Sequence, residues 1–151
     1  MKKKLSSLRI LFFGLALVIL SPVLHAEQKV VQSGYEIHYS AIPSSFLTPE
    51  VAQAYDLTRS RVMALLNIAV LKINEDGSTT PVNALVSGEA KNLVQQVKYL
   101  QFRQIKEVKA VYYISTFRFS NEEQLTFDIN VQPDPNQPAI NLRFSQTFYE
   151  G

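Results

Sequence analysis

Alternating hydrophobic and polar residues run through most of the chain and predict short β-strands. The longest run, VYYISTFRF at residues 111–119, places valine, tyrosine, serine and two phenylalanines on one face. Successive side chains of a strand point to opposite sides, so this face is expected to enter a core. The other face carries Tyr112 and Ile114 beside Thr116 and Arg118. That face is only half polar, which indicates that another part of the chain or a partner covers it.

The same pattern predicts six further strands, at residues 35–42, 61–73, 82–90, 98–106, 125–131 and 140–149. Residues 61–73 are apolar on both faces, which is typical of a central, covered strand. Gly88 marks a bulge or a close approach of two backbones. The segment 27–33 is polar and is expected to be a flexible lead-in.

One short helix is predicted near residues 48–57. Thr48 is a capping residue, Pro49 suits the first helical position, and Glu50 favours the positive first turn. Val51, Ala54 and Tyr55 are spaced to form one apolar stripe. So short a helix is not stable alone, so its stripe is expected to lie on the sheet.

Seven strands and one short helix, joined by short loops, predict a mainly β protein. The expected fold is an antiparallel, immunoglobulin-like β-sandwich, with a small β-barrel as the alternative. Residues 27–151 are long enough for a single domain of this kind.

Matching the apolar faces of the last three strands predicts their register. Phe117 is expected to pair with Phe127, and Phe119 with Leu125. The same reasoning pairs Phe127 with Phe144 on the last strand.

On the opposite face, this register places Asp128 across from Arg143 and near Arg118. These three residues, flanked by Tyr112, are the candidate binding site, an anion-recognising patch. The alternative is a surface ladder worth roughly 0.2–1 kcal/mol. Gln146 falls on the apolar face, where it is either a buried amide that needs partners or the sign of a bend.

Residues 1–26 have the three parts of a secretory signal peptide. Four basic residues precede the apolar run 10–20, and Leu24-His25-Ala26 resembles a cleavage site. An uncleaved anchor is the alternative, but 11 apolar residues fall well short of the roughly 20 that span a bilayer. We therefore expect cleavage, export to the periplasm, and no stable membrane span afterwards.

Removing this segment changes the charge. It contains four of the 15 basic residues and none of the 13 acidic ones, so the mature chain carries 11 basic and 13 acidic residues, a net charge of −2. The alkaline isoelectric point of the precursor therefore gives no argument for nucleic-acid binding by the mature chain. The chain has no cysteine, which excludes disulfides, thiol catalysis and thiolate metal sites.

No set of residues has the spacing of a catalytic or metal site. His38 is the only histidine after residue 26, and histidine triads and histidine-rich metal sites need more partners. The carboxylates show no glycosidase pair and no calcium loop. We therefore expect no catalytic residue, no metal and no cofactor.

The segments FLTPEVA, AVYYISTFRFSNEE and FSQTFY resemble the family DUF4426 of small exported proteins from Gram-negative bacteria. The resemblance covers essentially the whole chain after residue 26. It implies an envelope location and a compact, mostly β domain. It carries over no catalytic residue, because no activity is established for the family.

The sequence favours a periplasmic, non-catalytic binding or accessory protein. Its partner would be another envelope protein or a second copy, through the sheet face of Tyr112 and Ile114. Two alternatives stay open. The first is a small enzyme for an anionic substrate, which requires a pocket that joins Arg118, Asp128 and Arg143. The second is an apolar-ligand carrier, which requires an enclosed cavity.

Overall fold

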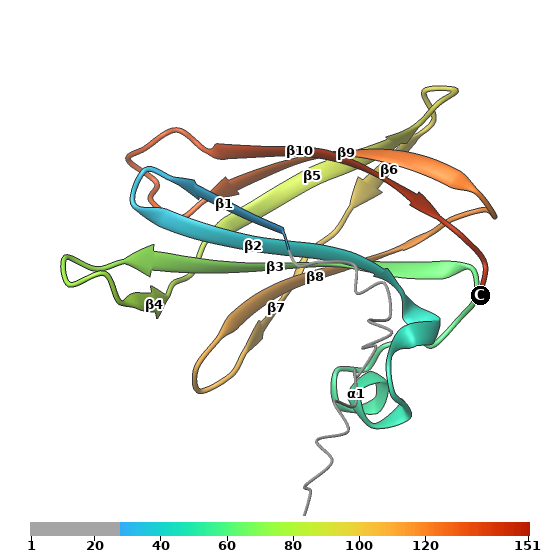
Figure 1. Ribbon diagram of the computed structural model, residues 1–151, viewed down its shortest axis with the longest axis horizontal. Coiled ribbons are helices and arrows are strands. Elements are labelled where there is room, and N and C mark those ends of the chain that lie inside the picture. The colour runs from blue at the N-terminus through green and yellow to red at the C-terminus, as the bar shows by residue number, and fades with distance from the viewer. Residues whose placement is uncertain (1–27) are drawn as a thin grey trace, which may run out of the picture.

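Two antiparallel sheets lie face to face in the computed structural model, which describes residues 28–151 (Figure 1). The predicted signal peptide, residues 1–26, lies outside the described residues. The mainly β sandwich is confirmed, and both sheets have open edges, so the described chain forms no closed barrel. No helix within residues 28–151 is both long and apolar enough to cross a membrane.

The first sheet has six strands. In spatial order they are β1 (Gln28–Gln32), β2 (Tyr35–Pro43), β3 (Met63–Ile73), β8 (Val111–Arg118) and β7 (Arg103–Lys106), with β4 (Thr79–Pro81) also paired to β3. The central position predicted for residues 61–73 is confirmed, because β3 is bonded to β2 and β8 along most of its length.

The second sheet has four strands. Their order is β10 (Ile140–Phe148), β9 (Glu123–Gln132), β5 (Leu85–Asn92) and β6 (Val97–Leu100). Gly88 on β5 lies where the backbones approach closely, because a Cβ there would meet the carbonyl oxygen of Asp128 at 2.5 Å. This confirms the close approach expected from the sequence.

The segment expected to be a flexible lead-in is a strand. Residues Gln28–Gln32 form β1, which pairs with β2 through a two-residue turn at Ser33 and Gly34. Both turn residues have positive φ, 54° and 80°, as a type I′ hairpin turn requires.

The single strand predicted over residues 98–106 is also wrong. The chain forms β6 in the four-stranded sheet, passes through Gln101 and Phe102, and continues as β7 in the six-stranded sheet. The predicted strand is therefore two strands, and β1 and β4 were not predicted. Together these changes give ten strands within residues 28–151 in place of the expected seven.

The predicted pairing of residues 111–119 with 125–131 is wrong, because β8 and β9 belong to different sheets. Phe117 and Phe127 do meet, but across the space between the sheets, with ring centroids 5.4 Å apart. The pairing predicted between the last two strands is confirmed, since Phe127 lies opposite Phe144 and Ile129 opposite Leu142.

Aromatic side chains fill the core between the sheets. The Phe127 ring stacks on Phe144 at 4.7 Å, and the edge of Phe148 packs against Phe117 at 5.4 Å. Gln146 is the partnered amide that the sequence offered as one alternative. Its side-chain amide nitrogen, Nε2, donates a hydrogen bond to the Ala41 carbonyl at 2.8 Å and so links β10 to β2.

Candidate functional site

The predicted ladder is only partly assembled. Asp128 lies opposite Arg143, as expected, with Oδ2 and Nη1 3.8 Å apart. Arg118 is on β8 of the six-stranded sheet, where it lies opposite Met63 of β3. The structure therefore does not bring Arg118 to Asp128 and Arg143, because the chain crosses between the sheets after β8.

The surroundings of Asp128 are those of a solvated sheet surface. The side chains of Arg143 and Asp128 are 71% and 42% exposed. Asn141 donates to Asp128 Oδ1 at 2.7 Å, and Lys91 pairs with Glu89 at 2.7 Å on the neighbouring strand. A recess of about 180 Å³ lies between these residues. Its charges are paired with one another, which fits the surface-ladder alternative.

Tyr112, the fourth predicted residue, lies on the opposite outer surface, which we call the apolar face. The apolar face is the outer side of the six-stranded sheet. Its residues occupy the alternate strand positions whose side chains point away from the core. They include Ile42, Leu65, Ala69, Leu71, Ile105, Tyr112 and Ile114. Tyr112 and Ile114 are half-buried.

Residues 44–61, which we call the strap, cross part of this face. The strap contains the 3-10 turn η1 (Ser44–Phe46) and the helix α1 (Pro49–Ala54). The helix is confirmed near its predicted place, and Thr48 Oγ1 accepts a hydrogen bond from the Val51 amide at 3.3 Å. The predicted stripe is formed only in part: Val51 and Tyr55 line a recess above the sheet, but Val51 is 40% exposed and Ala52 is the buried helix residue.

Both ends of the strap are fixed. At its base, the Ser60 amide donates to Ser44 Oγ at 2.9 Å. At its far side, the Tyr55 hydroxyl donates to Glu107, and Arg103 donates to the Tyr55 carbonyl. The hydrogen bond to Glu107 raises the pKa of Tyr55 above its ordinary value of 10.0.

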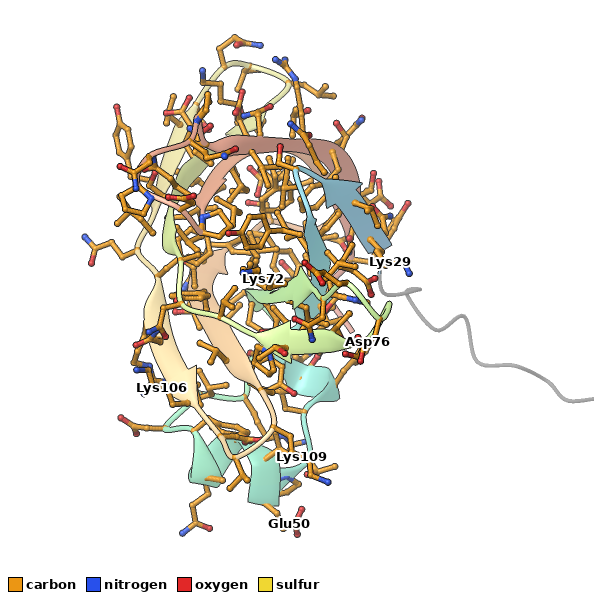
Figure 2. The ribbon with its side chains drawn as sticks, turned by 90° about the vertical axis from the view of Figure 1, so that its left-hand side faces the viewer. Lys29, Glu50, Lys72, Asp76, Lys106 and Lys109 are labelled. Carbon is orange, nitrogen blue, oxygen red and sulfur yellow. The ribbon has the colours of Figure 1, made fainter. Side chains whose placement is uncertain are left out.

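The second of these contacts joins the strap to the β7–β8 hairpin. Figure 2 shows Lys106, the last residue of β7, in the lower half of the molecule, and Lys109, within the hairpin turn, near Glu50 of α1. The strap therefore spans the apolar face from the end of β2 to the hairpin edge.

Two neighbouring recesses lie between the strap and the sheet. The apolar recess holds about 270 Å³ and is lined by Ser40, Ile42, Leu47, Val51, Tyr55, Leu57, Leu65, Asn67, Tyr112 and Ile114. The polar recess holds about 350 Å³ and is lined by Asp56, Leu57, Thr58, Met63, Gln101, Arg103, Ile114 and Thr116. Leu57 of the strap and Ile114 of the sheet line both recesses, so the two lie side by side, and we call the pair the groove.

Asn67 is the one amide that lines the apolar recess. Its Oδ1 atom is buried and has no hydrogen-bond partner in the described part of the chain. A buried polar atom without a partner costs about 1–3 kcal/mol. The fold therefore leaves one buried amide oxygen beside the apolar recess without a hydrogen bond.

His38 lies on the outer side of β2, where its Nε2 is 2.5 Å from Glu36 Oε1. Lys29 on β1 is 3.5 Å from the same oxygen. The hydrogen bond from His38 lowers the pKa of Glu36 below its ordinary value of 4.5. Among residues 28–151, no group of three or more histidine, aspartate or glutamate side chains is placed to hold a metal ion.

The sequence signalled the apolar face but not the groove. The signal was the two-sided apolar pattern of residues 61–73, together with Tyr112 and Ile114. Arg103 and Asp56 carry no local motif, and only the fold brings them beneath one strap.

Comparison with known proteins settles the family. The family model for DUF4426, a domain of unknown function, matches residues 29–151. The chain belongs to the DUF4426 family. The crystal structure of another DUF4426 protein, from Pseudomonas aeruginosa PAO1, is 32% identical with a TM-score of 0.71. The similarity covers 85% of this chain and 98% of that one.

More distant structures share the fold of this DUF4426 protein. FetP of the uropathogenic Escherichia coli strain F11, which was expressed in the periplasm, is 10% identical with a TM-score of 0.58 and covers 82% of this chain and 94% of that one. A copper-bound variant of FetP has a TM-score of 0.55 at 10% identity, with 82% of this chain and 95% of that one covered. The search of curated proteins found no match.

Proposed function

We propose that this DUF4426 protein is a periplasmic, non-catalytic binding protein that engages its partner through the apolar face. One observation carries the proposal: the two outer surfaces of the sandwich are chemically unlike. The four-stranded sheet carries the charge pairs of Asp128 and Glu89 beside the exposed ring of Tyr99. The six-stranded sheet carries one charge cluster at its β1–β2 edge, and the rest of its outer side is a group of half-buried aliphatic and aromatic side chains that the strap covers only in part. A persistent apolar surface of this kind is typical of an interaction site.

The periplasmic location is supported by two separate observations. The first 26 residues have the basic, apolar and cleavage regions of a signal peptide. The fold is shared with FetP, a protein that was expressed in the periplasm. Fusion of residues 1–26 to an alkaline phosphatase without its own signal would test export, and an inactive fusion would contradict it.

The binding role is tested by photo-crosslinking in the periplasm. A photo-reactive phenylalanine analogue replaces Tyr112 on the apolar face, with Tyr99 on the opposite sheet as the control, which is 81% exposed. We expect a crosslinked product from position 112 alone, and we expect Ile114→Glu to abolish it.

A product of twice the chain mass would identify the partner as a second copy, and any other mass would indicate another envelope component. Equal products from positions 99 and 112, or none from either, would contradict binding through the apolar face.

A further inference from the structure

The groove beneath the strap has two ends of opposite character. The apolar recess is lined mainly by aliphatic and aromatic side chains, and the polar recess by hydroxyl, amide and charged groups. Leu57 and Ile114 line both, so the two recesses are adjacent, and one elongated molecule lying across these two side chains would contact both. Small-molecule sites have volumes of roughly 300–1,000 Å³, and the two recesses together fall within that range.

The apolar recess is large enough for a hydrocarbon chain. Its volume of about 270 Å³ matches about nine groups the size of a water molecule, at about 30 Å³ each. A fully buried methylene group contributes about 0.8 kcal/mol, and because this recess is open on one side, each group of the chain gains part of that amount.

The polar recess presents both signs of charge. Arg103 and Asp56 line it together, and within residues 28–151 they form no ion pair with each other. Arg103 uses one donor for the Tyr55 carbonyl, and a guanidinium group has five. A head group that carries one negative and one positive charge complements this pair better than a head group of one sign.

We propose that the groove binds a single-chain amphiphile with a zwitterionic head group. The chain lies in the apolar recess against Leu65 and Tyr112, and the head group lies between Arg103 and Asp56. This inference rests on the proposed function, because it places the ligand on the same apolar face.

A peptide fits the groove less well. The strands that form the floor already bond to one another, with β3 paired to both β2 and β8. The N–H and C=O groups of an extended peptide would therefore meet mainly apolar side chains. Burying such groups without partners costs several kcal/mol by transfer data, about 4–8 in cyclohexane. A hydrocarbon chain carries no such groups.

Calorimetric titration of the full mature chain with dodecylphosphocholine, below its micelle concentration, tests the inference. Dodecyl phosphate, dodecyltrimethylammonium and dodecyl maltoside have the same chain with an anionic, a cationic and a neutral head. We expect saturable one-to-one binding that is tightest for dodecylphosphocholine. Equal affinity for all four probes would overturn the zwitterionic head group, and no saturable binding would overturn the inference as a whole.

Two variants place the ligand in the groove. Ile114→Glu is expected to weaken dodecylphosphocholine binding at least tenfold, because it puts a charge between the recesses. Arg103→Ala is expected to weaken it by up to about fivefold, the effect of one exposed ion pair. The controls are Val97→Glu and Arg143→Ala, which make the same changes on the four-stranded sheet.

Circular dichroism confirms that each variant is folded before titration. Equal losses in the variants and their controls would overturn the assignment to the groove, as would tighter binding of trileucine, an apolar zwitterion without a long chain. If no amphiphile binds but position 112 still crosslinks to a partner, the inference fails and the proposed function stands. If both experiments fail, both proposals fall.

Discussion

Glu123, at the start of β9, shows how opposing effects decide the pKa of one side chain. Burial alone would raise its pKa, since the side chain is only 12% exposed. Hydrogen bonds from the Ser120 amide at 2.9 Å and from Asn92 at 3.2 Å act in the opposite direction, as does the charge of Lys98. The net result is a pKa below the ordinary 4.5.

A lowered carboxyl pKa makes stability depend on acid in a defined window. The contribution of Glu123 is fully present above about pH 4.5, the ordinary value, and is lost as the pH falls through the lower folded pKa. We expect Glu123→Gln to reduce the slope of unfolding free energy against pH below that value, measured by urea denaturation. The control is Glu122→Gln, an exposed neighbour, and an unchanged slope in E123Q would contradict the assignment.

Gly88 is a position where absence of a side chain is needed for packing. A Cβ there would lie 2.5 Å from the Asp128 carbonyl oxygen and 2.9 Å from Ile129 Cα, both backbone atoms. We expect Gly88→Ala to lower the unfolding free energy by about 1–3 kcal/mol, the usual cost of overpacking. Ser87→Ala, on the exposed side of the same strand, should stay within about 0.5 kcal/mol. Equal stability of the two variants would show that the sheet relaxes easily.

At this scale the sequence predicted neighbours within a strand pair and failed between sheets. Asp128 opposite Arg143 and the partnered amide of Gln146 both follow from alternation within β9 and β10. Arg118 was misplaced because alternation tells which face a residue occupies but not which sheet. That choice depends on distant packing, which no local pattern records.

Among the elements, the strap combines a weak helix with firm attachments. Its helix has six residues, too few for independent stability, so contacts at its ends hold it in place. The bond from the Tyr55 hydroxyl to Glu107 joins it to the β7–β8 hairpin. Loss of that bond should therefore loosen the strap without disturbing the sheets.

We expect Tyr55→Phe to speed hydrogen exchange of the strap amides severalfold, including that of Leu57, which donates to the Ala52 carbonyl at 2.8 Å. Exchange in β3 and β9 should not change, because the removed hydroxyl makes no contact there. Tyr99→Phe is the control, since Tyr99 is 81% exposed on the other sheet. Unchanged exchange in the strap would show that other contacts hold it.

The sequence located most elements and missed the points where the chain changes layer. The helix start at Thr48 and the central strand follow from capping and two-sided apolarity. The break at Gln101 and Phe102 was missed because alternation continues through it, with Leu100 and Phe102 both apolar. The strand β1 was missed because its residues are largely exposed and its pairing with β2 supplies the order.

For the whole molecule, stability rests on the aromatic core between the sheets, since no cysteine is present to crosslink it. Phe127 is fully buried and contacts Phe117, Phe144 and Phe148. We expect Phe127→Ala to cost about 3–5 kcal/mol in urea unfolding, a large share of the 5–15 kcal/mol typical of a domain. Phe46→Ala is the control, because Phe46 is 63% exposed. Similar losses in both would contradict a core centred on Phe127.

The crossings between sheets also govern how the chain can fold. Leu66 pairs with Ser115, and Gly88 with Ile129, so each sheet is completed by strands far apart in sequence. Folds dominated by such pairings form in roughly milliseconds to seconds, more slowly than those built from local contacts. Until β8 inserts between β3 and β7, the edges of both strands are free to join another chain. The interval before that insertion is therefore the time of greatest risk for aggregation. Covering the free edge of β3 during this interval would lower that risk.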